Sequence, residues 1–334
     1  MRKFDWNDIT LKPAEFTDIK SRSEIKVKKL PLFVSPMDTV IDEKNAKKFL
    51  SLNFSVCLPR HIKWEENKDL SECFFSFGLE EIIDIVENKK NLPPKVLIDI
   101  ANGHIKKLYD VSKIIKEKYN VTLMIGNIAN PDTYRKYSEI GVDYIRCGIG
   151  GGSSCTTSAN GAVHYPMASL IKEIYEYKKD LENYGISCPK IVADGGFKNY
   201  SDIIKCLAIG SDFVMLGGVL NKALESCSPC FIKEDNGYKE VTKPEKLFKK
   251  TKLYKYYRGM STKEVQEKWG KKNIKTAEGI SFFNEVEYTL SGWTENFKDY
   301  LKSSMSYTDS IDLNEFKKSE FIFITQMSYK RYNK

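Results

Sequence analysis

No long hydrophobic run occurs in this chain of 334 residues, and this absence limits what the protein can be. No segment approaches the ~18–20 consecutive apolar residues of a membrane-spanning helix. The start of the chain carries no apolar signal region, so we expect a cytoplasmic protein with no membrane partner. No repeat, low-complexity tract or linker divides the chain. We therefore expect residues 1–334 to form a single domain.

The chain also lacks an arginine-rich arm and zinc-finger spacing, although its net charge is +8, from 53 basic and 45 acidic residues. Its lysines are scattered, often in pairs such as Lys28-Lys29 and Lys89-Lys90. A basic surface can attract nucleic acid, but it equally suits an enzyme for phosphorylated substrates. We favour a solvated lysine surface with no nucleic-acid partner.

The eight cysteines form no disulfide framework. Several lie in apolar segments, as reduced buried cysteines do. The one C-x-x-C motif runs from Cys227 to Cys230. Because no second pair accompanies it, this motif is a poor zinc site, and no redox-fold pattern surrounds it. We favour two structural thiols over a metal or redox function there.

What the sequence does contain is an alternation of short apolar runs with longer amphipathic ones. Residues 105–119, for example, carry apolar side chains at the helical spacings of three and four. Eight strands that alternate with helices predict a TIM (β/α)8 barrel, an α/β fold. A doubly wound open sheet is the alternative. The predicted strands are residues 32–35, 55–58, 76–78, 96–99, 122–126, 144–147, 190–193 and 213–216.

The alternation stops after residue 221. Residues 226–256 are charged and turn-rich and are long for a loop. Because long loops in compact domains are usually functional or mobile, we expect residues 226–279 to form a mobile loop or flap region. The apolar run at 321–324 lies in a C-terminal extension that we expect to pack on the barrel.

The most informative stretch is the glycine loop 148–157, which follows the predicted strand 144–147. Glycines let backbone N–H groups converge on an anion, and a cysteine beside such a nest lies in a positive field that favours the thiolate. One loop could thus hold a phosphorylated substrate and attack it through Cys155. Taken alone, the segment is equally well interpreted as a glycine-rich turn with a buried cysteine.

Two later predicted strands also end in glycines. The first ends in Asp194-Gly195-Gly196 and the second in Gly217-Gly218. In a parallel β/α barrel, the strand ends face one rim, which carries the active site. Three such ends in series, one with a cysteine, predict a phosphate site at this rim and favour the barrel over the open sheet.

These motifs, with several others in the same order, resemble the IMP dehydrogenase/GMP reductase family over most of the chain. The resemblance implies a β/α barrel, usually assembled as a homotetramer. It also implies hydride transfer between C2 of a purine nucleoside monophosphate (GMP or IMP) and a nicotinamide cofactor, through a covalent thioimidate on a cysteine. The motifs that carry it are residues 20–24, 35–40, 101–103, 126–127, 148–157, 193–196, 215–218, 257–261, 277–279 and 304–307.

The resemblance implies a role for each matching residue. Cys155 matches the nucleophile, which suits a thiol because sulfur adds to an electrophilic carbon and later leaves. Thr157 and Glu278 match the pair that handles ammonia departure. The other matching positions are Met37, Ser153, Asp194, Gly196, Gly217, Gly218, Met260 and Ser261 for the nucleotide, Arg60, Asp99, Ala101 and Lys275 for the cofactor, and the carbonyls of Gly150, Gly152 and Cys155 for a monovalent cation such as K⁺.

Two absences resemble the GMP reductase branch of the family. The Arg-Tyr pair that activates water in IMP dehydrogenases does not occur between Met260 and Glu278. The interval between Ser76 and Val96 is too short for the regulatory insert of most dehydrogenases. NADPH is then the expected cofactor, with NAD the alternative. An IMP dehydrogenase without this flap, an enzyme for a modified purine nucleotide, and a nucleotide-binding protein without turnover stay open.

The chain departs from both branches near the cysteine loop. Ser158 stands where a basic residue often follows, and His164 replaces a small residue. Met167 stands where glutamine is common, and Lys275 where reductases tend to place arginine. These departures leave the base and cofactor preference open.

Overall fold

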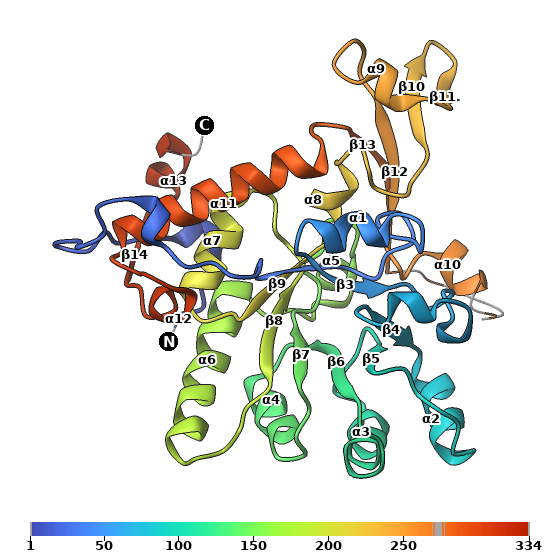
Figure 1. Ribbon diagram of the computed structural model, residues 1–334, viewed down its shortest axis with the longest axis horizontal. Coiled ribbons are helices and arrows are strands. Elements are labelled where there is room, and N and C mark those ends of the chain that lie inside the picture. Colours follow the sequence, from blue (N-terminus) through green and yellow to red (C-terminus); the bar gives the residue numbers. More distant parts are fainter. Residues whose placement is uncertain (1, 269, 271–275, 277, 333–334) are drawn as a thin grey trace.

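The computed structural model describes residues 2–268, 270, 276 and 278–332. Its centre is a closed barrel of eight parallel strands, in which β9 pairs back with β2 (Figure 1). The TIM barrel is confirmed, and so are all eight predicted strands, although the third begins two residues earlier than predicted. The strands are β2 (Leu32–Val34), β3 (Ser55–Leu58), β4 (Phe74–Phe77), β5 (Lys95–Asp99), β6 (Thr122–Ile128), β7 (Tyr144–Cys147), β8 (Lys190–Asp194) and β9 (Phe213–Leu216).

Helices outside the barrel connect its strands. Helix α3 buries Leu108, Val111 and Ile115, which form the apolar stripe seen in the sequence. Helix α4 begins with Pro131, where the Asn130 side chain accepts a hydrogen bond from the backbone N–H of Asp132. These helices are α1 (Ala46–Ser51), α2 (Leu79–Glu87), α3 (Lys106–Lys118), α4 (Pro131–Ser138), α5 (Thr157–Gly161), α6 (Met167–Asn183) and α7 (Tyr200–Ala208). Helix α2 alone connects β4 to β5.

The inside of the barrel is filled by side chains. The rings of Phe33, Phe74, Tyr144 and Phe213 lie with their centroids 5.1–5.9 Å apart. They pack in one apolar cluster with side chains from the other strands and with Met215 of β9. Because Met215 also lines the cavity at the carboxyl ends of the strands, this packed core forms the floor of that cavity.

Residues 226–256, which the sequence predicts as a loop, instead contribute three strands to an antiparallel sheet beside the barrel. Its order is β11-β10-β12-β13, and Figure 1 shows it projecting from the molecule. Tyr238 of β11 stacks on Phe283 of β13 with ring centroids 3.9 Å apart. The elements here are α8 (Gly218–Asn221), β10 (Cys230–Glu234), β11 (Gly237–Val241), α9 (Pro244–Leu247), β12 (Tyr254–Arg258), α10 (Lys263–Lys268) and β13 (Ser281–Glu285).

The two ends of the chain meet in a small sheet, where β1 (Ile9–Leu11) pairs with β14 (Phe321–Phe323). Helix α11 (Leu290–Tyr307) buries Trp293 and Phe297. The predicted apolar run packs only in part, because Phe321 contacts the core whereas Phe323 is 65% exposed. The remaining elements are α12 (Leu313–Phe316), α13 (Gln326–Tyr332) and the 3-10 helices η1 (Trp6–Asp8), η2 (Arg22–Glu24), η3 (Trp64–Glu66) and η4 (Lys68–Leu70).

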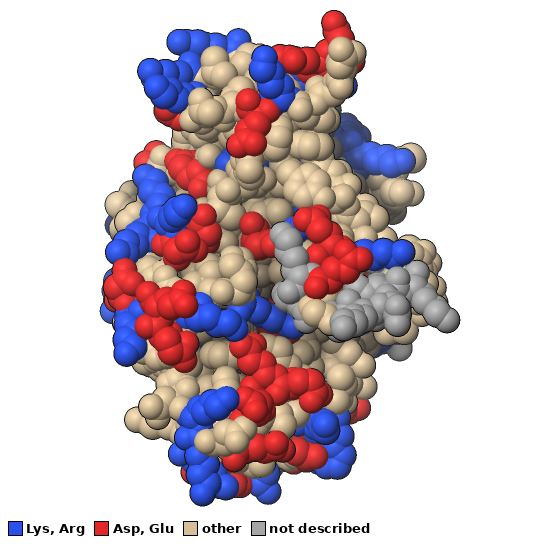
Figure 2. All heavy atoms as spheres, turned by 90° about the vertical axis from the view of Figure 1, so that its right-hand side faces the viewer, with Lys and Arg blue, Asp and Glu red and all other residues tan. Residues whose placement is uncertain are grey.

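The surface carries charges of both signs. On the face that Figure 2 shows, basic and acidic side chains lie interspersed. Within the described part of the chain, no helix combines the length and the apolar character that crossing a bilayer requires.

Candidate active site

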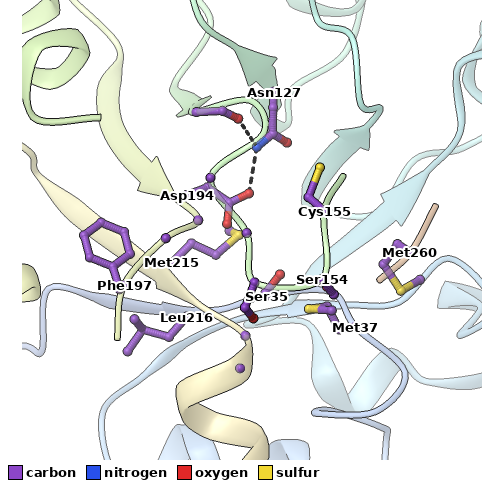
Figure 3. Close-up of a pocket in the computed structure, with 18 of the residues that line it drawn as sticks. Ser35, Met37, Asn127, Ser154, Cys155, Asp194, Phe197, Met215, Leu216 and Met260 are labelled. Carbon is purple, nitrogen blue, oxygen red and sulfur yellow. Dashed lines mark hydrogen bonds between the residues drawn. The ribbon is translucent and has the colours of Figure 1, made fainter. Parts of the chain in front are cut away.

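A cavity of about 520 Å³ opens at the carboxyl ends of the barrel strands, within the usual size of small-molecule sites. The loops after several barrel strands line it together with Tyr257, Met260 and Phe282 from the neighbouring sheet region. Figure 3 shows Asp194 and Cys155 on either side of this opening. Every predicted site residue that the structure describes lines the cavity, except Glu278, which contacts it through Thr157. Lys275 lies outside the described residues.

The glycine loop after β7 packs directly on the end of β8. Gly148 has a φ of 135°, a backbone conformation that residues with a side chain rarely adopt. A Cβ at this position would lie 2.3 Å from the Asp194 carbonyl oxygen and 2.3 Å from Met167 Cε. Glycine at 148 therefore allows the cysteine loop and the Asp194 strand end to share one cavity wall.

Ser153, Gly217, Gly218 and Tyr257 surround one small part of the cavity. Because the sequence predicts a phosphate site at these strand ends, we call this part the phosphate cradle. A Cβ on Gly217 would lie 3.1 Å from the Tyr257 hydroxyl, and one on Gly218 would lie 3.3 Å from Ser153 Oγ. The two glycines thus keep backbone and hydroxyl groups exposed to a ligand. Gly196 lines the same cavity from the end of β8.

Tyr257 is a site residue to which the sequence analysis assigned no role. Its side chain is buried, and its hydroxyl lies 3.4 Å from the sulfur of Met37. Burial raises the pKa of Tyr257 to about 12, so the phenol keeps its proton at neutral pH and can donate a hydrogen bond to an anion. The sequence feature that could have identified Tyr257 is its position as the first residue of the matching motif 257–261.

Cys155, Thr157 and Glu278 form a hydrogen-bonded series. The Cys155 thiol donates to the Thr157 hydroxyl at 3.3 Å, and that hydroxyl donates to the Glu278 carboxylate. Backbone contacts hold the segment in place, because the N–H of Thr156 donates to the Glu278 carbonyl at 3.0 Å. Cys155 also pairs with Gly279 as an isolated antiparallel bridge. A thiol and a carboxylate are therefore linked through one hydroxyl.

Arg146 links the two acidic residues predicted for cofactor and nucleotide. It donates to Asp99 Oδ1 at 2.5 Å and to Asp194 Oδ2 at 2.7 Å. Asn127 also donates to Asp194 Oδ2, at 2.8 Å (Figure 3). Because these bonds use only Oδ2, they leave Oδ1 of Asp194 available to a ligand. The sequence analysis did not identify Arg146 as a site residue. The feature that could have identified it is its charge within an otherwise apolar strand.

The surroundings of Asp99 keep it ionised. Burial acts to raise the pKa of Asp99, but the guanidiniums of Arg146 and Arg60 outweigh it and hold that pKa below the ordinary value. Arg60 Nε lies 3.4 Å from Asp99 Oδ2, and its Nη2 donates to the Asp99 carbonyl. An ionised carboxylate accepts hydrogen bonds from hydroxyl groups, so Asp99 fits the ribose of a nicotinamide nucleotide, and Ala101 lines the cavity two residues further on.

Two of the three carbonyls predicted for a cation already accept hydrogen bonds. Ser158 Oγ donates to the Gly150 carbonyl at 3.0 Å, and Cys155 N–H donates to the Gly152 carbonyl at 2.9 Å. Backbone carbonyl oxygens suit K⁺, and each keeps a second lone pair. Elsewhere in the described ranges, no group of three or more His, Cys, Asp or Glu residues is arranged for a metal ion.

The other departures lie in different surroundings. Met167 is buried beneath Gly148, whereas His164 is exposed.

The C-x-x-C segment holds two thiols that burial keeps protonated. Burial raises the pKa of Cys227 to about 12 and also raises the pKa of Cys230. A raised pKa is typical of inert structural thiols.

Comparison with known proteins places this site in a family. A family model described as "IMP dehydrogenase / GMP reductase domain" matches residues 94–333. GMP reductase 2 of Mus musculus is 26% identical over 97% of this chain and 95% of its own length. GMP reductase of Lactobacillus delbrueckii subsp. bulgaricus is 28% identical over 97% of this chain and 96% of its own length. GMP reductase of Onchocerca volvulus is 26% identical over 99% of this chain and 93% of its own length. Because the family model covers well over half of the sequence, this chain belongs to the IMP dehydrogenase/GMP reductase family of purine nucleotide oxidoreductases.

Proposed function

We propose that the protein is a GMP reductase, which converts GMP, NADPH and a proton to IMP, ammonia and NADP⁺. The observation that carries the proposal is the series Cys155–Thr157–Glu278. Loss of an amino group needs a proton source beside the nucleophile, and this series provides a carboxyl group and a hydroxyl there. Relatives named GMP reductase, similar over nearly the whole chain, support it.

In this proposal, the nucleotide spans the cavity from the phosphate cradle to Cys155. Ser153, Gly196 and the cradle glycines bind the phosphate, and the Tyr257 hydroxyl donates to it. Oδ1 of Asp194 accepts from the ribose hydroxyls. Met37, Met260 and Ser261 contact the purine base, which places C2 beside the cysteine.

The Cys155 sulfur adds to C2 of the purine ring, and the bond from C2 to the amino group breaks. The proton of the Cys155 thiol passes through the Thr157 hydroxyl to the Glu278 carboxylate, and Glu278 returns it to the amino group, so that ammonia leaves. A covalent thioimidate then joins Cys155 to C2. When bound, the nicotinamide supplies the hydride for C2. Cys155 leaves as a thiolate, and IMP is the product.

The two carboxylates support separate places for the two nucleotides. Asp99 lies on the far side of Arg146 from Asp194, so its carboxylate would hold the ribose of the nicotinamide nucleotide. Arg60 and Ala101 complete this side, and Lys275 stays a predicted contact. A potassium ion on the Gly150, Gly152 and Cys155 carbonyls and a homotetramer also stay predictions, and no step above depends on them.

The absorbance of the reduced nicotinamide tests the proposal. A fall with GMP and NADPH, and no rise with IMP and NAD⁺, is the expected result. A rise with IMP and NAD⁺ alone would instead identify an IMP dehydrogenase. Tight nucleotide binding without either signal would identify a binding protein and reject the reductase.

A further inference from the structure

Arg258 lies where three segments that border the cavity meet. It is the last residue of β12, between Tyr257 of the phosphate cradle and the loop that carries Met260. Its side chain is only 5% exposed. Because a buried guanidinium is costly without anionic partners, its contacts are informative. Arg258 contacts one carboxylate from each of two other segments.

The first carboxylate is that of Asp38. Arg258 Nη2 lies 2.5 Å from Asp38 Oδ2, and Nε lies 3.4 Å from Oδ1. Such a two-pronged contact sets direction as well as distance. Asp38 directly follows Met37, and the Tyr257 hydroxyl lies 3.4 Å from the sulfur of Met37. Asp38 therefore fixes the nucleotide-binding loop after β2 against β12.

The second carboxylate is that of Glu264 on α10. It forms an ion pair with Arg258 Nη1, while its own side chain is 51% exposed. The side-chain amide of Gln266 donates to the Ser261 carbonyl at 2.9 Å. Helix α10 is therefore also hydrogen-bonded to the loop that carries Met260 and Ser261, the predicted contacts to the base. Through Glu264, Arg258 fixes α10 beside Met260.

The strand of Arg258 is also in register with the segment that carries Glu278. Arg258 lies opposite Ser281 in the β12–β13 pair. The Gly259 N–H donates to the Ile280 carbonyl at 3.1 Å, and the Ile280 N–H donates to the Ser154 carbonyl at 3.0 Å. A shift of α10 against β12 is therefore transmitted toward the cysteine loop.

We propose that Arg258 is a positioning residue with two separable functions. Its contact with Asp38 orients the nucleotide-binding loop, and its contact with Glu264 orients α10 and the neighbouring segment for the chemical step. The inference rests on the proposed function, because GMP is the ligand that it concerns. It predicts that the two carboxylates, although they share one guanidinium, affect different quantities: Asp38 the Kd for GMP, and Glu264 the kcat.

The test replaces each carboxylate by the amide of the same shape. Asp38→Asn should weaken GMP binding about tenfold, because a charge-assisted hydrogen bond beside the nucleotide is lost. Glu264→Gln should leave the Kd for GMP within about twofold and lower kcat about tenfold. Arg258→Lys should show both effects, since an ammonium cannot contact both carboxylates as a planar fork does.

The Kd is measured by calorimetric titration of GMP without cofactor, and kcat by NADPH consumption. Glu320→Gln is the matched control, because Glu320 pairs with Lys12 at the surface with its side chain 71% exposed. This control should change neither quantity. Because Glu264 is half exposed, its amide variant should fold even where an Arg258 variant does not.

Parallel changes of Kd and kcat in both amide variants would reduce Arg258 to a structural cross-link and overturn the inference. An unchanged kcat in Glu264→Gln would do the same. Failure of the proposed function looks different, since the unmodified protein would then not consume NADPH with GMP, whether or not it binds the nucleotide.

Discussion

The Thr157 hydroxyl donates a hydrogen bond to the Glu278 carboxylate, although 121 positions separate the two residues in the sequence. The contact depends on the pairing of Cys155 with Gly279 at the edge of the cysteine loop. It brings a carboxyl group within one hydroxyl of the Cys155 thiol. In the proposed function, this relationship supplies the proton for the loss of ammonia.

Glu278→Gln should lower kcat for GMP reduction by about 10²–10⁴-fold, the usual contribution of a general acid or base. The amide keeps the shape and the contact with Thr157 but cannot supply the proton. The Kd for GMP should stay near its original value. Steady-state NADPH consumption and calorimetric titration measure the two quantities, and a kcat near that of the unmodified enzyme would remove Glu278 from the mechanism.

Cys155→Ala should abolish turnover and leave GMP binding largely intact, because the thiol forms the bond to C2 and is not needed to hold the phosphate. Intact-mass measurement of the quenched enzyme provides a second observable. GMP should add mass to the unmodified protein and none to the variant. Cys206→Ala, at a buried cysteine away from the cavity, is the control for thiol loss. Retained turnover in Cys155→Ala is the result that contradicts covalent catalysis.

Tyr257→Phe should raise the KM for GMP about tenfold, because it removes one hydroxyl donor to a charged phosphate. Guanosine, which lacks the phosphate, should bind to both proteins with equal affinity. The comparison of the two ligands separates a phosphate contact from a general loosening of the cavity. Equal weakening for GMP and guanosine would mean that Tyr257 only packs against Met37.

Asp99 should stabilise the fold in a pH-dependent way. Burial acts to raise its pKa, but Arg146 and Arg60 outweigh burial and lower the pKa below the ordinary 3.8. The folded chain therefore binds this proton more weakly than the unfolded chain. The stabilisation is complete above pH 3.8 and is lost as the pH falls through the lower folded pKa.

Asp99→Asn should accordingly flatten the acid side of a plot of unfolding free energy against pH. Urea titrations at a series of pH values measure it. Asp69→Asn is a suitable control, because the Asp69–Lys47 pair lies at the surface and should contribute little. An acid slope in Asp99→Asn equal to that of the unmodified protein would show that the Arg146 pair does not stabilise the fold.

The barrel was predictable because its signals are local. Each strand is a short apolar run, and those ending at Cys147, Asp194 and Leu216 lead directly into glycines. Parallel strand ends meet at one rim, so the glycine loops predicted the position of the cavity. The resemblance then predicted Cys155 and the residues around it.

The sheet beside the barrel was not predictable, because its inner strand β12 lacks apolar alternation. Lys255 is only 2% exposed there. Its ammonium donates to the carbonyls of Ser226 and Ser228, at 2.5 and 3.0 Å, which satisfies the buried charge. A lysine satisfied by distant carbonyls looks like a surface residue in the sequence. Arg146 was missed for the same reason, since its partners Asp99 and Asp194 come from other strands.

Reductive deamination is tested most directly by measuring ammonium released and NADPH consumed in the same reaction with GMP. The account predicts one ammonium for each NADPH oxidised, IMP as the product, and neither change in Cys155→Ala. NADPH oxidation without ammonium, or ammonium release without NADPH, would contradict the proposed chemistry at Cys155.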